Sequence, residues 1–236
     1  MESIIHFFSK FSFFGKYYPM YISGTIATIL ISLFTVALGT LIGILFAFMK
    51  LSKFKIFRAI SSTYIEITRG TPVLVQVLIW YTSLSPIFQK MSGIYIGELE
   101  LKRLLPGAIA LSLNSAAYVS EIIRAGILAV DKGQTEAAES LGMKKPMLMK
   151  YIIMPQAIKN ILPALGNEFV VLIKESSILF AIGIQELMAK TKAVQGTTML
   201  GIQPLLITAL IYFIITFILS RLLTKYERRL NKDDRN

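Results

Sequence analysis

The chain has 236 residues, of which 54% are hydrophobic, and its mean hydropathy is +0.63. This composition is too apolar for a soluble globular protein and indicates a membrane protein. The formal net charge is +11, although only 17% of the residues are charged. The absence of cysteine excludes disulfides, iron–sulfur clusters and cysteine-ligated zinc, and the single histidine, His6, excludes histidine-cluster metal sites and a Ser-His-Asp triad.

An aromatic leader over residues 1–19 precedes the first apolar run. Its phenylalanines and tyrosines, mixed with Lys10 and Lys16, are typical of a segment at the membrane interface, although a plain hydrophobic anchor explains them equally well. A cleaved signal peptide is not expected, because Glu2 stands where such peptides are basic and the apolar run that follows is too long.

Five segments are expected to cross the bilayer, since a spanning helix needs about 20 mostly apolar residues. The first is uncharged and the fifth is uncharged up to Ser220, whereas the second, third and fourth contain charged residues within them. The sequence therefore predicts an all-α membrane protein with five transmembrane helices, over residues 22–49, 59–84, 104–125, 157–184 and 202–221. These spans form one transmembrane domain over residues 20–230, followed by a cytoplasmic tail over residues 231–236.

Lysine and arginine are unevenly divided between the two sides of this topology. Fifteen lie in the segments between the first and second spans, between the third and fourth and after the fifth, or at the span ends that adjoin them, and seven lie on the other side. Because cytoplasmic loops are enriched in basic residues, we expect the N-terminus outside and the C-terminus in the cytoplasm. The basic excess then faces anionic membrane lipid, and no nucleic-acid-binding module is predicted.

The second predicted span contains charges and a helix breaker. Glu66 and Arg69 share one helix face, and Pro72, which cannot donate a backbone hydrogen bond, follows near mid-membrane. A broken helix at that depth is tolerated where protein or a water-filled cavity covers it. One interpretation is a packing kink with a structural ion pair. In the other interpretation this segment lines a substrate pathway, with Thr68, Arg69, Gly70 and Thr71 as the pathway residues.

The third predicted span carries a polar stripe, because Asn114, Tyr118 and Glu121 are spaced i, i+4, i+7. An amide and a carboxylate on one face suit an ammonium or guanidinium ligand, whereas Glu121 can instead pair with Arg124 one turn on. The remaining predicted pathway residues are Ser115 in this span and, in the fourth, Lys159 and Asn167.

Residues 130–155 form the long polar loop between the third and fourth spans. Residues 135–141 favour a short helix that ends at Gly142, and Pro146 suits the first turn of a second helix. Such a pair of helices presents small and apolar side chains either to a cytoplasmic partner or to the chain's own membrane domain.

This loop also carries a recognisable signature. Glu136-Ala137-Ala138, followed by Gly142, Ile152 and Pro155, resembles the EAA motif of bacterial ABC-importer permeases, with Met154 in place of leucine. The segments 66–72, 114–126, 155–157 and 174–176 are similar to the polar amino-acid branch of these permeases, the histidine, glutamine and arginine type. The resemblance covers residues 20–230 and implies the MetI-like fold of type I ABC importers.

The resemblance also implies an assembly in the bacterial cytoplasmic (inner) membrane. Two multi-pass permeases, either two copies or a pair of paralogues, would bind two ABC ATPase subunits and receive a polar amino acid from an extracytoplasmic binding protein. The ATPase would seat on the EAA loop, at Glu136, Ala137, Ala138, Ser140, Leu141, Gly142 and Met143. The sequence has no G-x-x-x-x-G-K-[ST] loop, so no cofactor is expected in this chain, and ATP and Mg would be held by the partner.

Two other classes of protein are the rivals. The intramembrane Glu and Lys residues permit a secondary transporter or channel, but five spans give no inverted repeat. A membrane-embedded enzyme would need clustered catalytic side chains, and Asp131, Asp233 and Asp234 all lie outside the predicted spans. Neither class explains the EAA loop, so the sequence predicts a permease subunit without enzymatic activity of its own.

Overall fold

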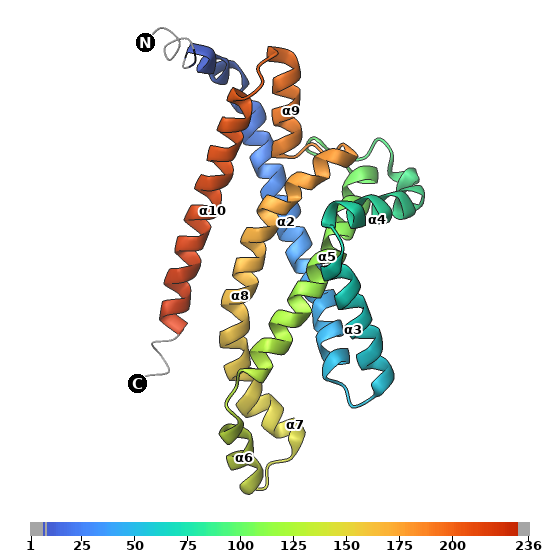
Figure 1. Ribbon diagram of the computed structural model, residues 1–236, viewed down its shortest axis with the longest axis vertical. Helices are drawn as coiled ribbons and strands as arrows, with labels where there is room; N and C mark the ends of the chain where they lie inside the picture. Colours follow the sequence, from blue (N-terminus) through green and yellow to red (C-terminus); the bar gives the residue numbers. More distant parts are fainter. Residues whose placement is uncertain (1–6, 8, 231–236) are drawn as a thin grey trace. The chain divides into compact units, whose positions relative to one another are not determined.

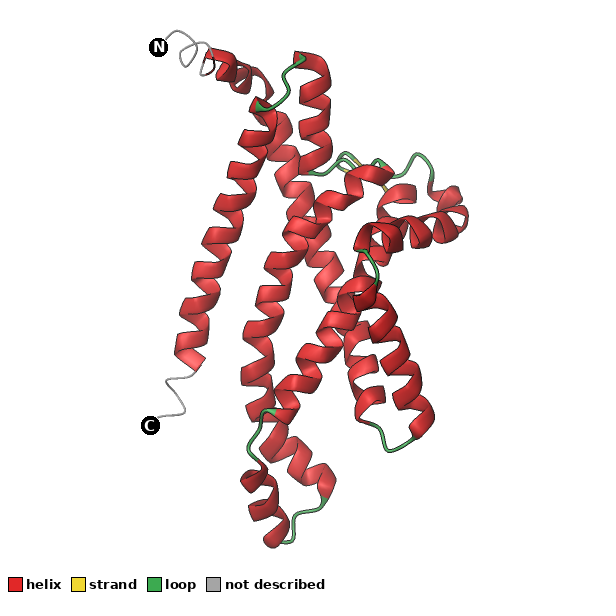
Figure 2. Cartoon of the chain, viewed as in Figure 1, coloured by secondary structure: helices red, strands yellow, loops and turns green. Residues whose placement is uncertain are grey.

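The computed structural model describes residues 7 and 9–230, and nearly all of this part is helical (Figures 1 and 2). Residues 14–19 of the predicted leader fall in the same helix as the first predicted span, whereas residues 1–6 and 8 and the predicted tail over residues 231–236 lie outside the described residues. The long helices are α2 (Phe14–Leu51), α5 (Leu101–Leu128), α8 (Met154–Glu175) and α10 (Gln203–Leu230).

Shorter elements connect these helices. The α-helices among them are α3 (Lys55–Gly70), α4 (Val73–Phe88), α6 (Lys132–Ser140), α7 (Lys145–Leu148) and α9 (Leu187–Thr198). Three are 3-10 helices, η1 (Lys10–Phe13), η2 (Gln89–Met91) and η4 (Ser176–Ile182), and one is a π-helix, η3 (Met149–Ile153). A short antiparallel hairpin, β1 (Tyr95–Ile96) and β2 (Leu99–Glu100), precedes α5.

Helices α2 and α10 are each long and apolar enough to cross a membrane. Two more spans are obtained if α3 with α4, and α5 with α6, each count as one bent span. Helix α8 is not among these candidates, and its sequence is interrupted by charges at Lys159, Glu168 and Lys174. Length and composition of the described residues therefore give two to four spans, against the five that the sequence predicts.

The predicted second span is divided into two helices at the Gly70–Pro72 breaker. Helix α3 ends at Gly70, helix α4 begins at Val73, and the pair is bent by 114°. Thr71 between them is extended, with φ −121° and ψ 150°, which is the conformation that a following proline imposes. Residues 59–84 therefore do not form one straight helix.

The chain divides into two compact units. The first contains residues 1–35, 74–111 and 172–218, and the second contains residues 36–73, 112–171 and 219–236. All four long helices contribute residues to both units.

The first unit is built around the N-terminal end of α9. Leu187 is fully buried and packs against Gly24 of α2 so closely that a Cβ on this glycine would lie 2.8 Å from the Leu187 Cα. Tyr21 is buried in the same cluster, and its hydroxyl donates to the carbonyl of Pro204 at the start of α10. Glu186 caps α9, accepting hydrogen bonds from the backbone amides of Met188 and Ala189 at 2.8 Å each.

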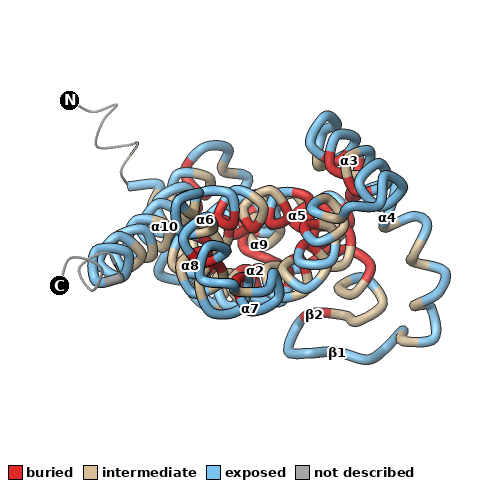
Figure 3. Tube along the Cα trace, turned by 90° about the horizontal axis from the view of Figure 1, so that it is seen from below, coloured by how far each residue is buried: buried red, intermediate tan, exposed pale blue. Residues whose placement is uncertain are grey.

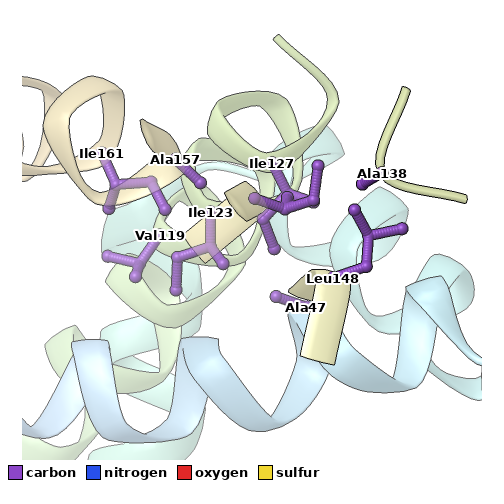
Figure 4. Packing of buried hydrophobic residues seen from close by; sticks show 9 residues of the cluster. Ala47, Val119, Ile123, Ile127, Ala138, Leu148, Ala157 and Ile161 are labelled. Carbon is purple, nitrogen blue, oxygen red and sulfur yellow. The ribbon is translucent and has the colours of Figure 1, made fainter. Parts of the chain in front are cut away.

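The second unit is held by an apolar cluster that joins α5 and α8 to the segment between them (Figure 4). Its members are buried small and branched side chains: Ala47, Val119, Ile123, Ile127, Ala138, Leu148, Ile153, Ala157 and Ile161. Two glycines one turn apart, Gly39 and Gly43, bring α2 close to α5, where they meet Ser115 and Val119. Small residues at this spacing are how membrane helices approach closely.

Several helices expose large apolar side chains, and Figure 3 shows α3, α4 and α10 coloured mostly as exposed. On α10 they include Leu210, Phe213 and Phe217, and on α4 Ile79 and Trp80. Apolar surface of this extent suits lipid or another membrane subunit and not water.

The close contact of α2 with α5 gives a first prediction. A Cβ at Gly43 would lie 2.7 Å from Val119 Cγ1 and 3.0 Å from the Ala116 carbonyl, so Gly43→Ala should destabilise the protein by about 1–3 kcal/mol through overpacking. Thermal unfolding of the purified chain in detergent measures this. Gly15→Ala is the matched control, because nothing lies within 4 Å of a Cβ there; equal melting temperatures for the two variants would contradict the packing argument.

Candidate functional site

The loop that carries the EAA signature folds into a helical knob, defined here as α6, α7 and the turn between them (Figure 1). Asp131 caps the start of α6, where its side chain accepts from the Gly133 amide at 2.8 Å. Helix α7 begins with Pro146 in its first turn, as the sequence predicts. It continues through the π-helical turn η3 into α8, so the knob is joined directly to a long helix.

Gly142 closes α6 in a left-handed conformation, with φ +79°. The Gly142 amide donates to the Glu139 carbonyl at 2.9 Å, and the Met143 amide donates to the Ala138 carbonyl at 3.1 Å. This pair of bonds is a Schellman motif, in which glycine is favoured because it has no Cβ to strain the left-handed backbone. Gly142 therefore fixes the angle of the knob.

The knob has an exposed face and a buried face. Glu136, Ala137 and Ser140 are exposed on α6, and Leu141 is 84% exposed. In contrast, Ala138 is 5% exposed and packs in the apolar cluster, with Met143 partly buried against it. The sequence predicts docking contacts at all of these positions, but the side chains of Ala138 and Met143 support the knob from beneath and are not on its exposed face.

One of the predicted pathway residues of α5, Ser115, contacts α8. Asn114 is 3% exposed, and the fully buried Ser115 donates a hydrogen bond to Glu168 Oε1 at 2.8 Å. Glu168 is itself 8% exposed, whereas its neighbour Asn167 points to the surface. The sequence places Asn167 on the pathway, but the structure brings Glu168, and not Asn167, to Ser115 of α5.

The residues at the end of α3 are only partly brought to this stripe. The guanidinium of Arg69 lies over the ring of Tyr118 at 5.4 Å, while Thr68 is buried and Gly70 and Thr71 are exposed. Such cation–π contacts partly compensate a charge that leaves water. The ion pairs formed among the described residues do not include Glu66 with Arg69, so the structural ion pair considered from the sequence is not seen.

Glu121 is at the centre of a three-residue ion cluster. Lys50 Nζ lies 2.6 Å from one carboxylate oxygen, and Arg124 Nη2 lies 3.0 Å from the other. The alternative pairing with Arg124 is therefore present, together with a second cation from α2 that sequence spacing does not reveal. A ligand ammonium at Glu121 would have to compete with both.

The ten predicted pathway residues do not form one cluster. Lys159 is half-buried on α8 and stands eight residues, about 12 Å, from Asn167 along the same helix. Glu121 lies two turns beyond Asn114 on α5.

No group of three or more metal-ligating side chains occurs among the residues that the structure describes.

Glu186 is a further buried acid, and the sequence analysis does not single it out. It is fully buried, caps α9, and accepts a hydrogen bond from the Tyr212 hydroxyl of α10 at 3.1 Å. The signal in the sequence that could have identified this helix cap was an acidic residue at the end of an uncharged stretch, directly before a helix. Its contacts are with the chain's own backbone and side chains, which indicates a structural role.

A family model described as the inner membrane component of binding-protein-dependent transport systems matches residues 39–232. The chain belongs to this family. It is therefore a permease component of an ABC transport system, which confirms the resemblance identified from the EAA motif. A permease subunit of this family is not itself catalytic.

Curated relatives cover nearly the whole permease. A putative glutamine transport system permease of Rickettsia conorii is 42% identical over 223 residues, covering 93% of this chain and 98% of the relative. The arginine transport system permease of Bacillus subtilis is 38% identical over 216 residues, covering 92% and 94%.

Solved structures agree with this assignment. A chain of a crystal structure titled as an amino acid ABC transporter with histidines matches with a TM-score of 0.81 and 48% identity, covering 91% of this permease and 95% of that chain. A chain of the inward-facing MetNI methionine ABC transporter matches with a TM-score of 0.73 at 14% identity, which supports the MetI-like fold alone.

The left-handed turn of the permease gives a second prediction. Gly142→Ala should weaken the Schellman turn by about 1–2 kcal/mol, which corresponds to roughly tenfold faster hydrogen exchange at the Gly142-position and Met143 amides. Gly142→Asn is the control, because asparagine tolerates this conformation better. Hydrogen exchange read by mass spectrometry over residues 138–145 measures both, and equal protection in the two variants would show that backbone conformation is not the reason for glycine here.

Proposed function

We propose that the chain is the membrane-spanning permease subunit of an ATP-driven importer of polar amino acids in the bacterial cytoplasmic membrane. It works with a second permease, either a copy or a paralogue, with a separate ABC ATPase and with an extracytoplasmic binding protein. The five spans are α2, the α3–α4 pair, α5, α8 and α10, with the N-terminus outside and the C-terminus in the cytoplasm. The observation that carries the proposal is the exposed face of the helical knob on its apolar base.

The knob is suited to receive force from another subunit. Its exposed face presents Leu141 with short neighbours, Ala137 and Ser140, so a groove of a partner can approach the helix closely. Its other face is anchored by Ala138 and Leu148 in the apolar cluster. Because packed cores resist deformation, a displacement of the knob moves α5 and α8 with it.

The substrate class rests on the relatives and on the buried acid of α8. Relatives named for glutamine and arginine transport point to a polar amino acid, whose ammonium group needs an acceptor inside the membrane. Glu121 already carries two cations, whereas Glu168 is buried between α5 and α8 and accepts a hydrogen bond from the neutral Ser115 hydroxyl. A buried carboxylate on an apolar membrane helix marks a functional position, so Glu168 is the stronger candidate to meet the ligand.

Transport then follows by alternating access. ATP binding closes the ATPase pair, the docked knobs follow, and rigid rotation of the helices exposes the pathway to one side of the membrane at a time. In this division of labour ATP and Mg are bound by the ATPase, and this chain supplies the pathway and the coupling surface.

Reconstitution tests the whole proposal. Proteoliposomes that contain the permease, its ATPase and its binding protein should take up radiolabelled glutamine, arginine or histidine only when ATP and the binding protein are both present. Uptake by the permease alone, or uptake driven by an ion gradient without ATP, would identify a secondary transporter or channel instead.

The exposed face of the knob gives a third prediction. Leu141→Asp should reduce co-purification with the ATPase and ATP-driven uptake at least about tenfold, because it places a charge in a buried apolar contact. Met199→Asp is the matched control, since Met199 is 88% exposed in the turn before α10. If Leu141→Asp retains its ATPase at wild-type yield, the exposed face of the knob is not the docking surface.

A fourth prediction separates the two acids of the pathway. Glu168→Gln keeps an oxygen for the Ser115 hydroxyl but removes the charge, so uptake should fall about tenfold or more while the ATPase co-purification stays unchanged. Glu121→Gln leaves Lys50 and Arg124 without their anion and should lower the melting temperature. Normal uptake by Glu168→Gln would remove Glu168 from the pathway.

A further inference from the structure

The last turns of α10 carry a basic face that is part of neither the helical knob nor the proposed pathway. Arg221, Lys225, Arg228 and Arg229 follow directly on the apolar part of the helix, and all four are exposed. At about 100° per residue they fall within an arc of about 100° on the helix surface. With Thr224 they line a hollow of about 570 Å³.

The rotation of the helix is fixed by a contact on its opposite side. Leu223 packs against Gly166 of α8 so closely that a Cβ on Gly166 would lie 2.3 Å from Leu223 Cδ2. Leu223 is about 170° from the middle of the basic arc. The basic face therefore points away from α8.

Ion pairs within the chain do not account for three of these basic residues. In the part that the structure describes, Lys225, Arg228 and Arg229 take part in none of the ion pairs. Stabilisation of the helix dipole acts within the last turn, which accounts for Arg228 and Arg229 but not for Lys225. A negatively charged ligand outside the chain would explain why one face gathers these charges.

The depth of the face identifies that ligand. Helix α10 is one of the two described helices that are long and apolar enough to cross a membrane by themselves, and its exposed Phe213, Phe217 and Ile218 lie just before Arg221. The basic face therefore begins where the hydrocarbon ends, at the level of the lipid phosphates. Exposed Leu222 and Tyr226 border it and provide apolar contact for the upper part of a lipid chain.

We propose that this basic face, Arg221, Lys225, Arg228 and Arg229, is a binding site for the phosphate headgroup of an anionic phospholipid in the leaflet where α10 ends. The lipid binds the end of α10 on the side opposite to the Leu223–Gly166 contact. The site goes beyond transport itself and does not depend on which solute is carried.

The single tryptophan of the chain allows a direct test. In the Trp80→Phe, Tyr226→Trp background the reporter stands beside the basic face, and the full-length chain is reconstituted in phosphatidylcholine vesicles with brominated phosphatidylglycerol or brominated phosphatidylcholine as quencher. Quenching should give a relative association constant for phosphatidylglycerol at least about threefold above that for phosphatidylcholine, declining with added salt.

The triple variant Lys225→Gln, Arg228→Gln, Arg229→Gln should bring this ratio to about 1. Its matched control removes the same charge from exposed residues at and just before the start of α3. This control, Lys53→Gln, Lys55→Gln, Arg58→Gln, should keep the wild-type ratio. An equal loss in both triple variants would mean general attraction to a basic protein and would overturn a defined site. Competition by inorganic phosphate beyond that of chloride at the same ionic strength would overturn the choice of lipid in favour of a soluble phosphate.

Discussion

The apolar cluster beneath the helical knob is the contact on which the rest of the second unit depends. Ala138 and Leu148 from the knob meet Ile123 and Ile127 of α5 and Ala157 of α8 in one core. A loop of mostly polar residues between two membrane helices has no reason to hold a fixed shape, because its backbone can be solvated in many ways. Burying a few small side chains in a shared core converts this loop into an extension of α5 and α8.

The charged residues in the apolar helices follow a common rule in both units. Four of them have identified partners: Glu121 has Lys50 and Arg124, Arg69 has the Tyr118 ring, Glu168 has Ser115, and Glu186 has the amides of α9. Ionisable groups in a membrane are costly unless they are paired or hydrated. The partners differ in charge, because Glu121 is paired with two cations and Glu168 accepts from a neutral hydroxyl.

Local chemistry made several parts of the structure predictable. The helix break at Pro72, the end of α6 at Gly142 and the place of Pro146 in α7 each depend on one residue and its immediate neighbours. The EAA spacing likewise identifies the family from a short stretch of sequence, and its residues lie together in the helical knob, some exposed and some buried.

The features that could not be predicted from the sequence depend on packing between helices that are distant along the chain. Adjacent residues on a helix differ by about 100° in direction. Which of Asn167 and Glu168 faces α5, and which of Ala137 and Ala138 packs in the apolar cluster, therefore depends on where α5 lies and not on composition. Lys50 reaches Glu121 across 71 positions of sequence, and no spacing rule reports such a pair. The role of Glu186 as a helix cap depended on a short helix, α9, that charge counting does not detect.

The glycines of the second unit indicate how a push on the knob would be carried. Gly39 and Gly43 bring α2 against α5, Gly126 of α5 receives Ile161 of α8, and Gly166 of α8 receives Leu223 of α10. At each crossing a side chain or backbone fills the space that a Cβ would need, so the helices cannot slide without a clash. The unit is therefore expected to move as one body, so that a displacement at Leu141 would reach the Ser115–Glu168 contact through these closely packed helix crossings.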